Sequence, residues 1–374
     1  MARPVTSHPT RRTVLTRLGL ASAATGLSVA VGEEIVRMVV PKRVPLRFDE
    51  FALENTGTGG AVNPMDFVDA DPELFWRFRK SVRLSRDGHG FFGLISNGQG
   101  LRMDHEVEVP RPASLLRILF LGDSCTFGYL LRYDQTTAWQ LEALLRLRFP
   151  DRLIECANAG VVGWTLFQGW RFLETEGAAY APQLVVVNFG WNEGVDWHGR
   201  SDAAYWQASR AVTPPAALRW SRICQLAWRT AAGKAGQLPE PVAGRLRVTP
   251  DEFIDLLGRV ERWTQLNGAE LLLLVGGARL NLVEPGSAFR TLYQEAQYAF
   301  GRKRTFGPDG GPAFVDGAAI EEDMWKSGTA AREIFLDGVH PSAASHVALA
   351  MALDARIGPW IASHPLGEGP RHRD

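Results

Sequence analysis

Three residues of this chain have types and positions that suit nucleophilic catalysis. Ser124 follows the apolar run at 116–121 through a Gly-Asp turn, so its hydroxyl is expected to be exposed at the end of a strand. Asp337 and His340 are three residues apart, which allows the carboxylate to hold the imidazole ring and fix its tautomer. His340 can then deprotonate Ser124, as in a Ser-His-Asp triad.

Two further polar blocks follow predicted strands. They are Asn-Ala-Gly-Val-Val-Gly at 158–163 and Gly-Trp-Asn-Glu at 190–193. Ligands bind beyond the carboxyl ends of the strands in parallel sheets, so both blocks are expected to meet Ser124 at one edge. Gly163 permits close approach of the backbone, and Asn192 offers an uncharged NH2 donor.

Four blocks, at 122–128, 158–163, 190–193 and 337–341, together resemble the SGNH (GDSL-type) hydrolase family in the family's order, over roughly residues 115–361. The segment Ser-Asn-Gly-Gln-Gly-Leu-Arg at 96–102 also looks like one that precedes the first block in some bacterial members. The resemblance implies that the oxyanion donors are the backbone N–H groups of Ser124 and Gly163 and the side-chain amide of Asn192.

The chain departs from the family pattern at one position. The third block usually ends in Asn-Asp, whereas Glu193 follows Asn192 here, which affects the expected local geometry. The α/β-hydrolase fold is the nearest alternative among serine esterases, but it requires Gly-x-Ser-x-Gly, and Thr126 occupies the position of the second glycine. It also separates its aspartate and histidine widely, so this fold is excluded.

Two tryptophans are expected to bind substrate, because each is adjacent to an expected oxyanion residue: Trp164 and Trp191. An insert at 194–249 contains four more tryptophans, and it is either a lid over the site or a small core of its own. The expected function is hydrolysis of an O-acyl ester, for example an acetyl ester, of a carbohydrate or lipid. The alternatives are an O-acyltransferase acting on a cell-envelope polysaccharide and a catalytically degenerate binding protein.

The elements that position these residues alternate between strand and helix. Strands that are apolar on both faces, alternating with helices, predict a doubly wound α/β domain with a three-layer α/β/α arrangement around a parallel sheet. The family resemblance implies the flavodoxin-like SGNH-hydrolase form of this fold. The predicted strands lie at 116–121, 152–156, 183–189, 270–275 and 313–316, and the predicted helices at 137–149, 165–176 and 251–266.

The α/β domain is expected at 113–362. The remaining residues precede or follow it in the sequence. Residues 33–112 are expected to form an N-terminal extension of short strands and loops, and 363–374 a flexible tail. Residues 1–32 have four arginines, then an uncharged stretch at 18–32, which is the layout of an export signal. Arg11-Arg12 resembles the twin-arginine signal, which implies the twin-arginine export machinery as a partner. The protein is therefore expected to be periplasmic or extracellular, or else anchored to the inner membrane by this segment.

The amino-acid composition limits the classes of partner that the protein is expected to bind. The 374 residues include 41 Lys and Arg and 41 Asp and Glu, so the chain lacks the net positive charge typical of nucleic-acid-binding proteins. Hydrophobic residues make up 45%, which excludes a mostly disordered chain. No metal site is expected, because the three cysteines are far apart and His340 and His346 are six residues apart. No cofactor is expected either. Cys125 and Cys156 are expected to be buried thiols.

Overall fold

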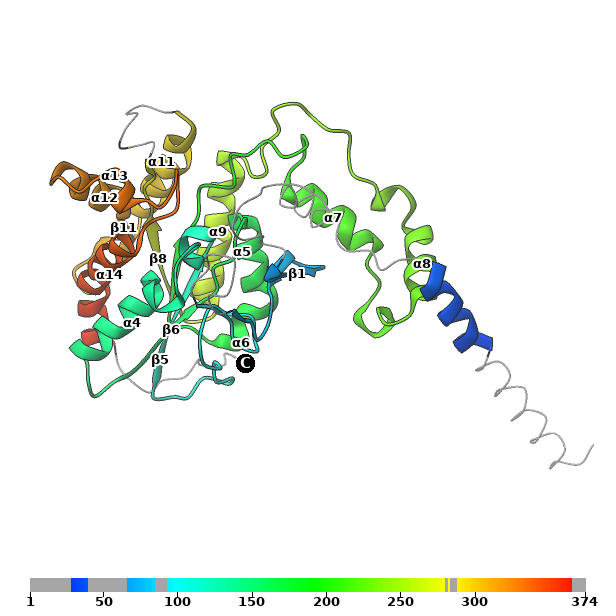
Figure 1. The fold of residues 1–374 in the computed structure, drawn as a ribbon, viewed down its shortest axis with the longest axis horizontal. Coiled ribbons are helices and arrows are strands. Elements are labelled where there is room, and N and C mark those ends of the chain that lie inside the picture. Colours follow the sequence, from blue (N-terminus) through cyan, green and yellow to red (C-terminus); the bar gives the residue numbers. More distant parts are fainter. Residues whose placement is uncertain (1–27, 40–65, 85–92, 280–281, 283–287, 365–374) are drawn as a thin grey trace, which may run out of the picture. The chain divides into compact units, whose positions relative to one another are not determined.

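The chain divides into two compact units in the computed structural model, which describes residues 28–39, 66–84, 93–279, 282 and 288–364 (Figure 1). Unit 1 comprises Met1–Val44 and Gln207–Leu238, and unit 2 comprises Pro45–Trp206 and Pro239–Asp374. Within these described ranges, no helix combines the length and apolarity needed to span a bilayer. The expected signal at 1–27 and the expected tail from 365 lie outside the described residues.

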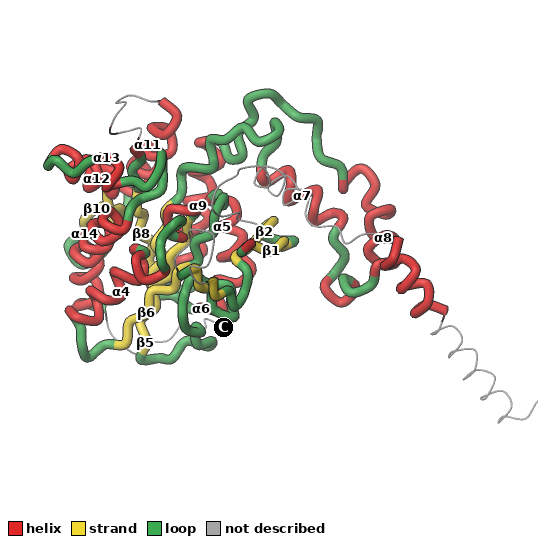
Figure 2. The backbone as a smooth tube through the Cα atoms, in the orientation of Figure 1, coloured by secondary structure: helices red, strands yellow, loops and turns green. Residues whose placement is uncertain are grey.

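Unit 2 is built on a five-stranded parallel sheet (Figure 2). Its strands stand in the order β6-β5-β7-β8-β11, which is the 2-1-3-4-5 order of flavodoxin-like doubly wound folds. This confirms the predicted fold class. The strands are β5 (Leu115–Gly122), β6 (Leu153–Asn158), β7 (Leu184–Asn188), β8 (Glu270–Val275) and β11 (Phe314–Asp316).

Helices cover both faces of the sheet. On one face, α4 (Thr137–Arg148) and α14 (Ala343–Ser363) pack on a core that includes Phe120 of β5. On the other face lie α5 (Leu166–Phe172), α9 (Pro250–Leu266) and α11 (Ala288–Arg302). The shorter elements are α3 (Ser124–Phe127), a π-helical turn (Leu173–Gly177), α6 (Ala178–Tyr180), α12 (Gly317–Lys326), α13 (Ala331–Ile334), β9 (Thr305–Phe306) and β10 (Gly311–Pro312).

The helix α9 shows why the sequence begins a helix where it does. Thr249 and Glu252 form a reciprocal capping box, in which the Thr249 side chain accepts from the Glu252 N–H and the Glu252 carboxylate accepts from the Thr249 N–H. Pro250 occupies the first helical turn, where its missing N–H costs no hydrogen bond. The helix therefore starts one residue before the predicted range of 251–266 and ends where that range ends.

Beyond the helix at 28–39, which the expectation of short strands and loops did not include, the described part of the N-terminal extension contains two antiparallel strand pairs. In one, β1 (Val68–Asp71) pairs with β2 (Phe75–Phe78), and in the other, β3 (Arg83–Leu84) pairs with β4 (Leu94–Ile95). Trp76 of β2 donates its indole N–H to the Val162 carbonyl at 2.8 Å. The extension is thereby attached to the loop that carries Gly163.

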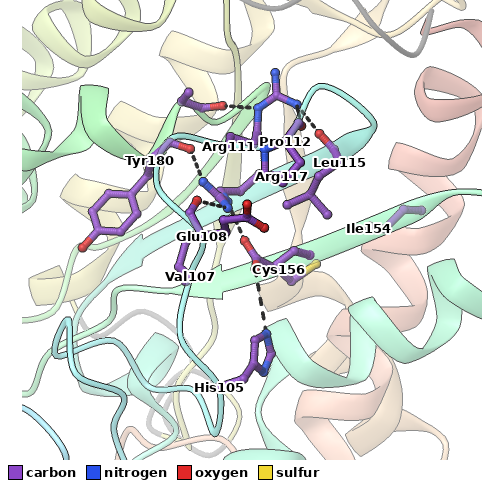
Figure 3. A network of polar contacts seen from close by, with 12 residues as sticks. His105, Val107, Glu108, Arg111, Pro112, Leu115, Arg117, Ile154, Cys156 and Tyr180 are labelled. Carbon is purple, nitrogen blue, oxygen red and sulfur yellow. Dashed lines mark hydrogen bonds and ion pairs between the residues drawn. The ribbon is translucent and has the colours of Figure 1, made fainter.

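A buried arginine ties the extension to the sheet (Figure 3). The Arg117 side chain, on β5, has no solvent exposure and forms an ion pair with Glu155 of β6. It also donates to the carbonyls of Glu108, at 2.9 Å, and Tyr180, at 2.5 Å. Breaking a buried pair of this kind by removing one partner costs about 3–5 kcal/mol, so Arg117 is a structural residue of this end of the sheet.

The predicted insert at 194–249 is divided between the units. Helix α7 (Asp202–Val212) crosses the boundary, and unit 1 contains α8 (Arg222–Ala232) and the 3-10 turns Ala216–Leu218 and Gly233–Gly236. A helix at 28–39 belongs to the same unit. The two ends of the insert meet again in unit 2, where the Arg247 N–H donates to the Val195 carbonyl at 3.0 Å.

Candidate active site

The nucleophile candidate stands at the first residue of a one-turn helix. Asp123 caps α3, and its carboxylate accepts a hydrogen bond from the Cys125 N–H at 2.8 Å. The turn requires glycine at 122, because a Cβ there would lie 1.9 Å from the Thr126 hydroxyl oxygen. Ser124 is consequently presented beyond the carboxyl end of β5, and its side chain is partly exposed.

The structure brings the three predicted triad residues together. His340 Nε2 lies 2.9 Å from Ser124 Oγ, and His340 Nδ1 lies 2.6 Å from Asp337 Oδ2. The other carboxylate oxygen, Asp337 Oδ1, accepts the backbone N–H groups of Val339 and His340 at 2.8 and 2.9 Å. This loop between α13 and α14 is closed by a hydrogen bond from the Leu336 N–H to the His340 carbonyl.

The electrostatics of the triad favour an ionised aspartate. Partial burial acts to raise the pKa of Asp337, but hydrogen bonds and charge attraction from His340 and the N–H of Val339 hold that pKa well below its ordinary value. Tyr129 packs against the His340 ring, with ring centroids 4.7 Å apart. The imidazole is therefore held on both its edge and its face, with Nε2 directed at the serine.

A second histidine is a structural residue. His346 of α14 is 1% exposed, and its Nδ1 accepts a hydrogen bond from the Thr137 N–H at 3.0 Å. Burial lowers the pKa of His346 to about 3, so its ring is neutral. Since this pair joins α4 to α14, it fixes two core helices together.

Each of the three expected oxyanion donors has a local feature that suits a hydrogen-bond donor. Ser124 begins a helix, so its N–H has no intrahelical acceptor. Gly163 has φ +73°, a left-handed conformation that favours glycine. Asn192 donates one amide hydrogen to the Trp164 carbonyl at 2.8 Å, which places its side chain beside the Gly163 loop and leaves the second amide hydrogen for another acceptor.

A buried arginine supports the Gly163 loop from behind. Arg247 Nη1 donates to the Gly163 carbonyl at 2.8 Å. The same guanidinium makes a two-pronged pair with Asp202 at 3.2 and 3.0 Å, and it also donates to Gln168 at 3.1 Å. Arg247 is 2% exposed and Asp202 is fully buried, so the whole arrangement lies inside the protein. The returning end of the insert thus positions this loop.

Glu193 connects the loop that carries Gly163 to the loop that carries Asn192. Its carboxylate accepts from the Leu166 N–H at 2.8 Å and from the Gly190 N–H at 3.0 Å. Burial, with the nearby Asp123 carboxylate as a second cause, raises the pKa of Glu193 to about 8. Burial likewise raises the pKa of Asp123 to about 6. The family's usual aspartate is therefore replaced by a longer acid that bridges two backbone segments.

The two tryptophans expected to bind substrate differ in position. Trp164 is 1% exposed and donates its indole N–H to the Trp76 carbonyl at 2.9 Å, so the expectation that it contacts substrate is wrong. Its adjacency to Gly163 in sequence did not reveal that the ring turns inward. Trp191 is partly exposed and lines a narrow pocket together with Cys125 and Pro341, the neighbours in sequence of Ser124 and His340.

No sequence pattern indicated the residues that support the Gly163 loop, which are Trp76, Asp202 and Arg247. Their partners are distant in sequence: Arg247 contacts a carbonyl 84 positions away, and Trp76 one 86 positions away. A weak signal was available for Arg247, since it lies at the end of the insert, two residues before the Thr249 cap of α9.

Comparisons with solved structures give the following similarities. LAE5, an α/β hydrolase enzyme from the metagenome of Lake Arreo, Spain, is 17% identical, with a TM-score of 0.45 over 66% of this chain and 96% of that one. Axe2, an acetylxylan esterase from Geobacillus stearothermophilus, is 20% identical, with a TM-score of 0.44 over 69% and 97% of the two chains. A comparison with curated proteins gives no match.

A comparison with sequence families is more informative. Residues 120–348 match the GDSL-like Lipase/Acylhydrolase family, which is more than half of the chain. The match begins within β5 and ends within α14, so it includes all four blocks, at 122–128, 158–163, 190–193 and 337–341. The chain therefore belongs to the GDSL-like lipase/acylhydrolase family and is an ester hydrolase.

Proposed function

We propose that this ester hydrolase is a serine esterase that removes an O-acyl group, such as acetyl, from a carbohydrate or lipid through an acyl-enzyme. The observation that carries the proposal is the continuous chain of contacts from Asp337 through His340 to Ser124, at 2.6 and 2.9 Å. Family membership supplies the class of reaction, and this geometry supports the role of each residue.

The chemistry follows from the contacts. His340 Nε2 takes the Ser124 proton as Oγ attacks the ester carbonyl carbon, and Asp337 stabilises the imidazolium that forms. His340 then gives the proton to the departing alcohol, leaving an acyl group on Ser124. In the second half, His340 deprotonates a water molecule that attacks the acyl carbon, and the carboxylic acid leaves as Ser124 regains its proton.

The negative oxygen of each tetrahedral intermediate needs hydrogen-bond donors. We assign these to the N–H groups of Ser124 and Gly163 and to the free amide hydrogen of Asn192. Such donors act most strongly when they are held in place before the reaction. The contacts from Arg247 to the Gly163 carbonyl and from Asn192 to the Trp164 carbonyl support this preorganisation.

The partial exposure of Trp191 and Asp337 favours a carbohydrate ester as the substrate and hydrolysis as the reaction. Trp191, which precedes Asn192 in the sequence, is partly exposed, and its aromatic surface is suited to the apolar face of a sugar ring. The Asp337 side chain is 42% exposed, which indicates that water reaches the triad. Access of water favours hydrolysis over acyl transfer to a sugar hydroxyl.

A panel of esters tests the proposal. We expect hydrolysis of p-nitrophenyl acetate to exceed that of the butyrate and octanoate esters, and we expect acetate release from acetylated xylan or another O-acetylated sugar. Ser124→Ala should lower the rate by at least about 10⁴-fold while leaving the melting temperature unchanged. Undiminished activity in Ser124→Ala contradicts the serine mechanism, and a preference for octanoate contradicts the small acyl group.

A further inference from the structure

The two units of the chain carry opposite charge. Unit 1 holds 12 of the 41 Lys and Arg residues and 2 of the 41 Asp and Glu residues, which gives it a net charge of +10 and leaves −10 for unit 2. The segment Gln207–Leu238 alone has five basic residues and no acidic one. Such asymmetry within a chain of zero net charge indicates that unit 1 meets an anionic surface.

Helix α8 of this unit is amphipathic and exposes its apolar side. Ile223 and Leu226 are 37% and 44% exposed, and Trp220, just before the helix, is 66% exposed. Arg222, Gln225 and Arg229 recur at the spacing of the opposite face of the helix. Basic residues on one face and Trp, Ile and Leu on the other are typical of a helix that lies in a membrane interface.

The helix at 28–39 is joined to α8 by a buried acid. The Glu33 carboxylate accepts hydrogen bonds from the N–H groups of Arg222 and Ile223, at 2.6 and 3.2 Å, and from the Ser221 hydroxyl at 2.8 Å. This helix also exposes large apolar side chains, with Met38 at 79% and Val39 at 70%. The helix begins within the uncharged stretch at 18–32, and both belong to unit 1.

We propose that unit 1 binds the surface of an anionic lipid bilayer, with α8 lying in the headgroup region. Phosphate headgroups match its charge, and the hydrocarbon boundary matches the exposed Trp220, Ile223 and Leu226. A nucleic acid would satisfy the charge but would leave these apolar side chains in water. The bilayer is the surface that accounts for both features, and the proposal does not depend on the esterase assignment.

Vesicle co-sedimentation of the full chain tests this surface. We expect binding to phosphatidylcholine vesicles that contain phosphatidylglycerol, with weaker binding at high salt and on vesicles of phosphatidylcholine alone. Each basic residue near an anionic bilayer contributes roughly fivefold in affinity, so reversing the charge of Arg219 and Lys234 with Arg219→Glu and Lys234→Glu should weaken binding by more than tenfold. Trp220→Ser with Leu226→Ser should do the same.

Matched variants in unit 2 serve as controls. Lys80→Glu with Lys303→Glu changes charge equally, and Leu147→Ser with Leu266→Ser removes apolar side chains that are 81% and 86% exposed. These controls should bind like the unaltered chain. Equal binding by the unit 1 variants would overturn the role of α8, as would binding that is insensitive to lipid charge and salt, because the uncharged stretch at 18–32 would then account for it.

A label on α8 gives a readout that needs no substitution. Cys224 is partly exposed, whereas Cys125 and Cys156 are 7% and 3% exposed, as the sequence predicted, so a thiol-reactive NBD dye should attach to Cys224. We expect its emission to shift to the blue and intensify on anionic vesicles. Emission that stays as in water while the protein co-sediments would contradict the proposal. Hydrolysis of p-nitrophenyl acetate by each variant is measured in parallel, so that loss of vesicle binding is separated from loss of the esterase.

Discussion

Among single residues, the rate of the reaction depends on which hydrogen-bond donors face the negative charge that develops on the substrate oxygen. Asn192 is a test of this, because it has two amide hydrogens and one of them is used by the Trp164 carbonyl at 2.8 Å. A donor that contacts the oxygen only as charge develops affects kcat more than KM. The same residue holds the loop, so its catalytic and structural contributions have to be measured separately.

We expect Asn192→Ala to lower kcat by about 10²–10³-fold with little change in KM, which is the usual cost of losing one oxyanion donor. Asn192→Asp keeps the volume but places a negative charge where the oxyanion forms, so it should be at least as damaging. Steady-state kinetics and melting temperatures of the three proteins check this. A large fall in melting temperature with a proportionate loss of activity would make Asn192 a structural residue instead.

Glu193 predicts a dependence of stability on pH. Its folded pKa is raised by burial to about 8, so the folded protein retains a proton that the unfolded chain releases above its own pKa near 4.5. The contribution of this carboxyl to stability is therefore greatest below pH 4.5 and is lost as the pH rises through 8. Between pH 5 and 8 we expect the unfolding free energy of the unaltered chain to fall relative to Glu193→Gln, by an amount on the order of 2–4 kcal/mol. Urea unfolding at several pH values measures this, and parallel pH profiles for the two proteins would refute it.

Among the helices and strands, the sequence predicted those that a local residue pattern determines. The five strands of the sheet were predicted because residues such as Val185–Val187 are apolar on both faces, and α9 because its capping residues precede a periodic run. The helices α7 and α8 were not predicted, because the only pattern recognised in that part of the insert was its aromatic residues. The triad was predicted because its residues follow strands or lie three apart. The inward turn of Trp164 and the contact of Arg247 with the Gly163 carbonyl depend on how the insert returns to the sheet, which no local pattern encodes.

We expect Arg247, at the returning end of the insert, to affect catalysis through the Gly163 loop. Arg247→Lys keeps a positive charge beside the buried Asp202 but loses the planar fork that also reaches the Gly163 carbonyl. We expect kcat to fall roughly tenfold while KM changes little, because a displaced Gly163 loop weakens stabilisation of the transition state. Arg117→Lys is the matched control, since Arg117 is equally buried but belongs to the opposite end of β5. It should lose stability without losing activity per folded molecule. Equal kinetic effects of both variants would show that Arg247 has no special link to the site.

At the scale of the whole molecule, the N-terminal sequence bears on where the protein works. We propose export through the twin-arginine route, because Arg11-Arg12 precedes a weakly apolar stretch that has no charge until Glu33. Replacing both arginines, as Arg11→Lys with Arg12→Lys, should leave the protein in the cytoplasm, which cell fractionation detects. Unchanged export of this variant would reject the route. Exported protein whose N-terminal sequence begins at Met1 would favour a retained anchor, which also suits the bilayer surface proposed for unit 1.

Covalent trapping measures whether Ser124 is the nucleophile of a functional triad. A fluorophosphonate reacts with a serine only when a neighbouring base activates it and donors receive its phosphoryl oxygen. After incubation with such a probe, peptide mass spectrometry should locate a single adduct on Ser124, and His340→Ala should abolish labelling while the protein stays folded. An adduct on another residue, or undiminished labelling of His340→Ala, would contradict the account.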